Sequence, residues 1–300
     1  MTDTNLKTVT VVLPVKDEIA IVAAEALTFG PALEAADYRV LSEGRAFEVS
    51  VKTPDGEKFQ TDLAERLKKD GIKADICVQP AGDRRKGLLI CDMDSTLIGQ
   101  ECIDELADFA GVKDYVSEIT ERAMRGELDF ESALKERVGL LKDLPLKTLQ
   151  TCFEKRITLN PGADTLAKTM AASGAKTLIV SGGFTFFSQR IAQAAGFAKH
   201  QANILLDDGA ALTGTVAMPI LGREAKREAL LESSADIGGP GNAIAIGDGA
   251  NDLAMIQAAG LGIAYYAKPA VAAAAHCAIN HTDLTTALFY QGYSEDEFVA

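Results

Sequence analysis

The sequence predicts an α/β protein: a Rossmann-like, doubly wound parallel sheet that carries a helical cap insert and follows a small α+β domain. Three observations lead to this fold class. Three short apolar runs, at residues 88–91, 177–180 and 243–246, have the composition of strands that are buried on both faces. Residues 100–156, between the first two runs, show helical spacing only. Residues 8–78 alternate in the order β-α-β-β-α-β, which favours a ferredoxin-like unit.

The N-terminal unit, residues 1–82, is expected to be a small domain of its own. Strands are expected at residues 8–13, 38–41, 46–51 and 73–78, and helices at 18–28 and 56–70. The unit looks like the regulatory small-molecule-binding modules called ACT domains, but it contains no ligand motif. A packing or dimerisation module, and with it a homodimer, is therefore an equal alternative. Residues 80–86 are polar and rich in breakers, which predicts a linker to the second domain, residues 83–300.

The core strands are expected to place their polar residues at one edge of the sheet. Asp92 and Asp94 follow the first strand, Ser181 follows the second, and Asp248 and Asp252 follow the third. In open α/β sheets, ligands bind beyond the carboxyl ends of the strands. Carboxylates this close repel each other, so the arrangement calls for a cation or a shared proton. An Asp-x-Asp pair alone is usually a surface turn, but three strand ends of this kind are much harder to obtain by chance.

The helical stretch predicts a cap over that edge, at about residues 100–157. Helices are expected at residues 101–110, 113–125, 130–140 and 147–155, and the core resumes with a helix start at 160–162. A cap can exclude water from the site beneath it, which strengthens the electrostatic interactions inside. Farther along, residues 203–209 and 212–216 predict a hairpin with an Asp-Gly turn.

Four motifs, taken in order, resemble those of the haloacid dehalogenase-like phosphatases. They are Asp92-Met93-Asp94-Ser95-Thr96, Ser181, Lys226 and Gly247-Asp248-Gly249-Ala250-Asn251-Asp252. The resemblance runs from about residue 87 to about residue 290. It is closer still to the members of that family that hydrolyse O-phosphoserine, through residues 101–105, 137–138, 181–184 and 267–269.

The resemblance implies a role for each acid at the strand ends. Asp92 is expected to be the nucleophile that attacks phosphorus and forms an aspartyl-phosphate. Asp94 is expected to protonate the leaving serine oxygen and then to take a proton from the hydrolytic water. The cofactor is expected to be Mg²⁺, bound by Asp92, the backbone carbonyl of Asp94, and Asp248. Asp252 is expected to orient the metal waters or to hold Lys226 from behind.

The phosphate oxygens are expected to be bound by Lys226, Ser181 and the backbone N–H of Gly182 or Gly183. Asn251 is expected to contact phosphate or substrate. The alternative for Lys226 is a solvated lysine on a helix surface, next to Arg227.

The rest of the substrate is expected to be recognised by the cap. By resemblance, Glu101 takes the ammonium of O-phosphoserine, Arg137 takes its carboxylate, and Phe130 and Met124 form the pocket wall. Each residue also has a plain alternative. Glu101 would be a helix-start acid, Arg137 a surface partner of Glu136, and the other two simply core.

Composition limits the partners and the location. A net charge of −13 argues against nucleic acid and anionic membranes as partners. Five scattered cysteines without a C-x-x-C pair are typical of reduced thiols, and no signal peptide or membrane span is evident, so a cytoplasmic protein is expected. Two other functions stay open. One is a phosphatase of this family for phosphoethanolamine or a sugar phosphate, and the other is a phospho-accepting signalling receiver.

Overall fold

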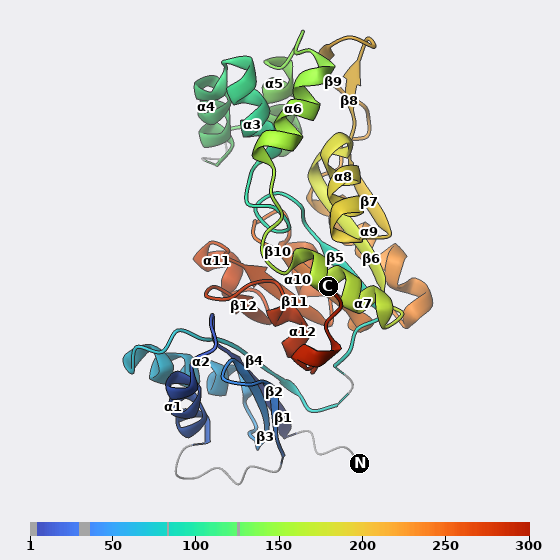
Figure 1. Ribbon diagram of the computed structural model, residues 1–300. Helices are drawn as coiled ribbons and strands as arrows, with labels where there is room; N and C mark the ends of the chain where they lie inside the picture. The colour runs from blue at the N-terminus through green and yellow to red at the C-terminus, as the bar shows by residue number, and fades with distance from the viewer. Residues whose placement is uncertain (1–4, 30–36, 83, 125–126) are drawn as a thin grey trace.

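The computed structural model describes residues 5–29, 37–82, 84–124 and 127–300, apart from the side chain of Met124. Figure 1 shows three parts in a row. The small N-terminal sheet lies at the bottom, the large sheet with its helices lies in the middle, and the helices of the insert lie at the top.

The large sheet has six strands in the order β12-β11-β10-β5-β6-β7, and every neighbouring pair is parallel. Its strands are β5 (Leu88–Cys91), β6 (Lys176–Phe184), β7 (Lys199–Asn203), β10 (Ala243–Gly247), β11 (Leu261–Tyr265) and β12 (Cys277–Ile279). The three predicted core strands, β5, β6 and β10, are therefore adjacent. Their carboxyl ends lie side by side, which brings the three polar clusters together.

Helices cover both faces of this sheet, as a doubly wound fold requires. Along β5, Leu88 and Ile90 pack with α9 and α10, whereas Leu89 and Cys91 pack with α7 and α8. The flanking helices are α7 (Ala163–Ala172), α8 (Thr185–Ala195), α9 (Arg223–Ser234), α10 (Leu253–Ala258), α11 (Pro269–Ala272) and α12 (Thr286–Tyr290), with short 3₁₀ helices at Ala235–Ile237, Pro240–Asn242 and Glu295–Glu297. Burial on both faces explains why these strands are continuous apolar runs.

The cap consists of four helices, as predicted, and of a hairpin that the sequence did not assign to it. Its elements are α3 (Cys102–Ala110), α4 (Lys113–Met124), α5 (Phe130–Gly139), α6 (Leu146–Arg156), β8 (Leu205–Asp207) and β9 (Leu212–Val216). The hairpin is antiparallel, and its backbone is hydrogen-bonded to the α5–α6 connection. Leu212 N donates to Leu144 O, and Leu212 O accepts from Asp143 N, both at 2.9 Å. Figure 1 shows it beside α5 and α6 at the top of the molecule.

Two short linkers join the cap to the core, and they are bonded to each other. Ile98 and Leu159 form an isolated β-bridge, and the Gln100 side chain exchanges two hydrogen bonds of 3.0 Å with Thr158. Asn160 Nδ2 also donates to Thr96 O at 2.8 Å. The cap is therefore connected to the core by two hydrogen-bonded linker segments, which hold it over the strand ends.

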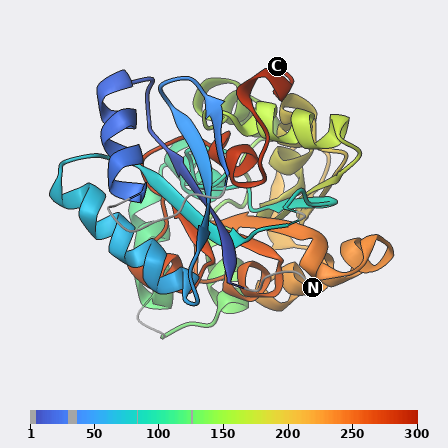
Figure 2. The same cartoon turned by 90° about the horizontal axis from the view of Figure 1, so that it is seen from below.

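The N-terminal unit has the ferredoxin-like order β2-β3-β1-β4, and all its pairs are antiparallel. Its elements are β1 (Leu6–Val12), α1 (Glu18–Phe29), β2 (Tyr38–Ser42), β3 (Ala46–Lys52), α2 (Gly56–Lys69) and β4 (Asp75–Pro80). Figure 2 shows α1 and α2 together on one side of this sheet. The last strand begins two residues later than predicted, because residues 70–72 still close α2 through Ile72 N, which donates to Leu67 O.

The other face of the small sheet packs on the part of the chain that forms the large sheet. Val12, Leu41, Ala46 and Cys77 belong to the same apolar cluster as α12. The predicted linker is not a free tether either, since Arg84 forms a 2.6 Å ion pair with Glu48. The two units therefore share a core.

A buried aspartate ties the two units together. Asp75 is 3% exposed. Its carboxylate accepts from the backbone N–H groups of Asn280, His281 and Thr282 and from the Thr282 hydroxyl, at 2.7–3.1 Å. Arg45 adds a 2.9 Å ion pair to Asp283. The segment that follows β12 is thus bound by side chains from the N-terminal unit.

Within the described residues, no helix is both long and apolar enough to cross a membrane. All five cysteines are free and buried, as expected of reduced core thiols.

Candidate active site

The polar ends of β5, β6 and β10 open into one cavity of about 380 Å³ beneath the cap. The core contributes eight of its described lining residues, and the cap contributes the other eight. The lining consists of Asp92, Asp94, Glu101, Ile103, Thr120, Ala123, Leu128, Phe130, Leu134, Arg137, Ser181, Gly182, Gly183, Phe184, Asp248 and Asn251. Residues that are far apart in the sequence are therefore brought to one site.

Asp92 lies at the centre of the core side of this site. It directly follows β5, and its own N–H continues the sheet by donating to Ile246 O at 2.9 Å. One carboxylate oxygen accepts from Met93 N at 2.7 Å and the other contacts Lys226 Nζ at 2.7 Å. The residue is only 5% exposed. A buried carboxylate that is held from two sides has a fixed orientation.

Lys226 is not the solvated helix lysine of the alternative interpretation. Its side chain is 1% exposed, and it bridges Asp92 and Asp252, with Nζ 2.7 and 2.6 Å from their oxygens. Burial by itself lowers the pKa of Lys226, but the two carboxylates raise it more, so the ammonium stays charged.

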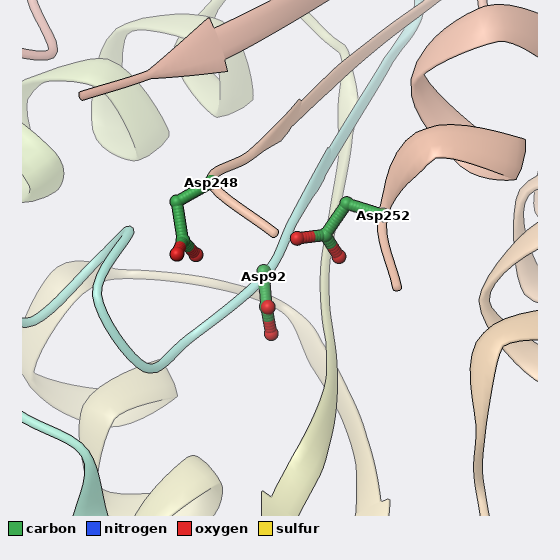
Figure 3. A group of neighbouring side chains, drawn as sticks. All are labelled: Asp92, Asp248 and Asp252. Atoms are coloured by element: carbon green, nitrogen blue, oxygen red, sulfur yellow. The ribbon is translucent and has the colours of Figure 1, made fainter. Parts of the chain in front are cut away.

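Three carboxylates form a group that could hold a metal ion. Figure 3 shows Asp92, Asp248 and Asp252 side by side, and one oxygen from each lies within 4.8 Å of the others. Both oxygens of Asp252 already accept hydrogen bonds, from Lys226 and from Gly249 N at 3.0 Å. Asp252 is therefore placed to support its neighbours, and Asp92 and Asp248 face the cavity. A set of hard oxygen donors suits a divalent cation such as Mg²⁺.

The acids of this site resist ionisation. Burial raises the pKa of Asp248 to about 6 and the pKa of Asp252 to about 7, and the charge on Asp92 adds to both shifts. Burial is the larger cause of both shifts, and the negative charge of Asp92 is the second.

Asp94 leaves the strand end on the cap side. Cys102 N, at the start of α3, donates to its carboxylate at 3.2 Å. Burial raises the pKa of Asp94 to about 7, although the bond from Cys102 acts the other way. Close to neutral pH, such a group can both donate and accept a proton. Gly183 leaves it room, because a Cβ there would lie 2.5 Å from Asp94 Oδ2.

The end of β6 supplies uncharged groups. Ser181 is buried, and its hydroxyl accepts from Gly183 N at 2.9 Å. Gly182 O accepts from Asn203 Nδ2 at 2.8 Å, and Leu221 N donates to the amide oxygen of the same Asn203. Sequence reasoning did not single out Asn203, which anchors this loop to the start of α9.

Two charged residues of the cap reach the cavity. Glu101 precedes α3 without capping it, and Ser95 Oγ donates to Glu101 Oε1 at 2.6 Å. Loss of water around this carboxyl raises its pKa to about 8, with Asp94 as the next cause, although the residue remains exposed at the cavity mouth. Arg137 Nη1 donates to Thr120 Oγ1 at 3.4 Å. Arg122, and not Arg137, is the ion-pair partner of Glu136.

The wall of the cap is only partly described. Phe130 lines the cavity and is 38% exposed. Its ring lies close to Gly182 of the core, since a Cβ added to Gly182 would be only 3.1 Å from the ring. The side chain of Met124, predicted as the second wall residue, lies outside the described part of the structure.

Sequence reasoning also missed three residues that support the charged groups. Thr96 Oγ1 donates to Asp248 Oδ1 at 3.1 Å, Ser95 bonds Glu101, and Thr120 bonds Arg137. Thr96 and Ser95 fall inside the first motif, so their position in the sequence could have marked them as residues of the site. Thr120 carries no signal, because only the packing of α4 against α5 brings it to Arg137.

Known proteins with similar sequences are hydrolases. A family model described as haloacid dehalogenase-like hydrolase matches residues 87–260. The phosphoserine phosphatase of a Polaromonas species is 47% identical over 203 residues, which are 66% of this chain and 86% of that protein. The phosphoserine phosphatase of Archaeoglobus fulgidus is 42% identical over 71% of this chain, and the match spans 63% of that protein's length.

Solved structures agree with the sequence matches. The unliganded structure of a probable phosphoserine phosphatase from Vibrio cholerae is 32% identical, with a TM-score of 0.77 over 99% of this chain and 90% of that chain. A phospho-aspartyl intermediate analogue of phosphoserine phosphatase is 40% identical, with a TM-score of 0.63 over 69% of this chain and 99% of that chain. The chain therefore belongs to the haloacid dehalogenase-like hydrolases and groups with the phosphoserine phosphatases among them.

Proposed function

We propose that this chain hydrolyses O-phosphoserine to serine and phosphate, the last step of serine biosynthesis, through an aspartyl-phosphate on Asp92. One observation carries the proposal. A single cavity joins the acids of the strand ends, one of which is paired with the buried Lys226 of α9, to a carboxylate and a guanidinium of the cap. The first group suits a phosphate, and the second suits the ammonium and carboxylate of an amino acid.

In the first step, an oxygen of Asp92 attacks phosphorus while the bond from phosphorus to the serine oxygen breaks. Asp94, protonated, gives its proton to that leaving oxygen. Lys226, Ser181 and the N–H groups of the glycines beside it would neutralise charge on the phosphoryl oxygens, and Asn251, which lines the same cavity, would contact phosphate or substrate. The products of the step are free serine and an acyl phosphate on Asp92.

In the second step, water attacks the phosphorus of the acyl phosphate. Asp94, now ionised, takes the proton of this water, and the bond between phosphorus and Asp92 breaks. Free phosphate leaves, and both aspartates return to their starting protonation states. A single residue with a pKa of about 7 can serve in both steps.

Mg²⁺ is the cofactor that we propose, held by Asp92, the backbone carbonyl of Asp94, and Asp248. When bound, it would polarise the phosphoryl group and offset the charge of the surrounding carboxylates. Asp252 would act from behind this set, since its oxygens already bond Lys226 and Gly249.

The two ends of the amino acid would be recognised by Glu101 and Arg137, with Phe130 and Met124 as walls. A closed cap needs a partner for each charge, because burying an unpaired ion costs several kcal/mol. The helical cap and the hydrolase relatives argue against the alternative of a signalling receiver. A receiver has no need of a residue that promotes hydrolysis of its own phosphoryl group.

The test is phosphate release across a panel of phosphate esters, with and without Mg²⁺. We expect O-phosphoserine to be the best substrate, EDTA to remove activity, and Mg²⁺ to restore it. Ca²⁺ should restore it poorly, because its larger shell of roughly six to eight oxygens would engage both oxygens of Asp92. A clear preference for phosphoethanolamine or a sugar phosphate would contradict the substrate proposed here.

For the whole chain, we propose a division into residues 1–82 and 83–300, with the cap at about residues 100–157. Two separate sheets support this division. We further propose a cytoplasmic location, supported by the five free cysteines. A homodimer would form through the N-terminal sheet, whose edge strand β2 is open. Sedimentation would test the dimer, and cell fractionation would test the location.

A further inference from the structure

Ser95 stands out from its neighbours because its backbone lies in the left-handed region, with φ at 56°. A residue with a Cβ disfavours this conformation, so the surrounding turn must enforce it. The turn is closed by Leu97 N and Ile98 N, which both donate to Met93 O, and by Ser95 N, which donates to Gln100 O at 3.3 Å. The direction of the Ser95 side chain is therefore set by the backbone.

The Ser95 hydroxyl is directed at the cap. It donates to Glu101 Oε1 at 2.6 Å. Glu101 occupies the N-cap position of α3, but its side chain makes no capping bond, so the usual helical role of an acid at this position is not in use. In the described part of the chain, no protein group bonds the second oxygen, Oε2.

The negative charges around Glu101 would drive its side chain out of the cavity, toward solvent. Asp92, Asp94 and Asp248 line the same cavity, and each repels the Glu101 carboxylate. Glu101 is also exposed, so it could relax toward solvent at little cost. One hydroxyl at 2.6 Å is the contact that opposes this relaxation.

We propose that Ser95 is a positioning residue for selectivity toward phosphate esters that carry an ammonium group. By holding Oε1, it turns Oε2 of Glu101 into the cavity to accept from the substrate ammonium. Because Ser95 directly follows Asp94 in the chain, the oxygen that binds the ammonium is held at a fixed distance from the atoms that react. This inference rests on the proposed function and adds a residue to it.

Three substrates allow the contact to the ammonium to be measured separately from the contact to the carboxylate. O-phosphoserine carries an ammonium and a carboxylate, 3-(phosphonooxy)propionate lacks only the ammonium, and O-phosphoethanolamine lacks only the carboxylate. The readout is the ratio of kcat/KM for phosphoserine to kcat/KM for 3-(phosphonooxy)propionate, and, for each substrate, whether KM or kcat changes.

Two variants separate the hydroxyl from the backbone. Ser95→Gly removes the hydroxyl and accepts the left-handed backbone freely, whereas Ser95→Ala removes the hydroxyl and keeps the strain. We expect both to lower the ratio about tenfold, mainly through a higher KM for phosphoserine. Phosphoethanolamine should lose as much as phosphoserine. A ratio that stays unchanged in Ser95→Gly would overturn the proposal.

A double variant shows whether Ser95 acts through Glu101. In a Glu101→Gln background, Ser95→Gly should lower the ratio no further, because the carboxylate that it positions is gone. Independent, multiplying losses would overturn the proposal, and so would equal losses on all three substrates, which mark a purely structural turn. If the wild-type protein shows no preference for phosphoserine over 3-(phosphonooxy)propionate, the proposed function itself fails.

Discussion

At the scale of residues, the charged side chains that line the cavity are mostly acidic, which suits the binding of cations. Among the described residues, four carboxylates, from Asp92, Asp94, Glu101 and Asp248, line the cavity with one guanidinium, from Arg137. Lys226 lies beneath them and is shared by Asp92 and Asp252. A divalent cation and a substrate ammonium would both reduce the excess negative charge. The substrate's phosphate and carboxylate would face the cations that remain.

The imbalance predicts how stability depends on pH. Burial raises the pKa of Asp94 and Asp252 to about 7 in the folded protein, above the ordinary value of 3.8. A raised folded pKa gives stability that is full below the ordinary value and is lost as the pH rises through the folded value. We therefore expect the metal-free protein to unfold at lower urea concentration at pH 8 than at pH 5.

Mg²⁺ should oppose this loss, because it favours the ionised carboxylates. The measurement is urea unfolding at both pH values, with EDTA and with Mg²⁺. A metal-free protein that is equally stable at both pH values would contradict the charge imbalance.

The two charged residues of the cap should be separable by substrate. Glu101→Gln should weaken phosphoserine and phosphoethanolamine, and Arg137→Ala should weaken phosphoserine and 3-(phosphonooxy)propionate. Each lost charge-assisted contact is worth roughly 1.5–3 kcal/mol, or about 10–100-fold in kcat/KM. Steady-state kinetics on the three esters checks this. If both variants lose activity equally on every ester, the residues hold the cap together and do not recognise the substrate.

At the scale of elements, the strand ends position the chemistry, and a glycine at the end of β6 leaves room for it. A Cβ on Gly183 would lie 2.5 Å from Asp94 Oδ2 and 3.1 Å from Ser181 Oγ. Any larger residue must displace Asp94, whose position relative to the leaving oxygen would decide the rate of proton transfer in the mechanism that we propose.

Gly183→Ala should therefore lower kcat by roughly 10–100-fold on all esters, since displacing a catalytic group by about 1 Å can cost that much. The control is Gly139→Ala in α5, where an added Cβ meets nothing within 4 Å. Phosphate-release kinetics and thermal unfolding of both variants check this. Full activity in Gly183→Ala would show that Asp94 has more freedom than its surroundings indicate.

The core elements were predictable from sequence because burial on both faces produces continuous apolar runs. The same logic identified Asp92, Ser181 and Asp248, which follow such runs directly. Thr120 and Asn203 were not predictable, because their bonds join segments that are far apart in the chain and leave no periodic signal. The pairing of the β8–β9 hairpin with the cap was missed for the same reason.

The whole molecule is less modular than its sequence suggests. Composition predicted a separate N-terminal domain and a linker, and the small sheet does have the predicted topology. However, its inner face shares an apolar cluster with α12, and Asp75 accepts four hydrogen bonds from residues 280–282. A binary pattern cannot reveal that both faces of a small sheet are covered.

Asp75→Ala should destabilise the protein by about 2–4 kcal/mol, because it leaves buried donors without an acceptor. Asp75→Asn is the matched control, since it keeps the shape and one oxygen acceptor, and it should lose less. Urea unfolding measures both variants. A loss below about 0.5 kcal/mol in Asp75→Ala, the range of ordinary surface substitutions, would show that the contact between the units is not important for stability.

The central claim is that Asp92 carries the phosphoryl group from O-phosphoserine. Asp94→Asn should slow both steps, because Asp94 serves in both, but it leaves the nucleophile intact. If the acyl phosphate still forms faster than it is hydrolysed, mixing this variant with O-phosphoserine and Mg²⁺ and quenching in acid traps the intermediate. Mass spectrometry of the digested protein should then find one phosphoryl group, on Asp92, and Asp92→Asn in the same experiment should carry none. Phosphate on any other residue, or labelling that persists in Asp92→Asn, would contradict the account.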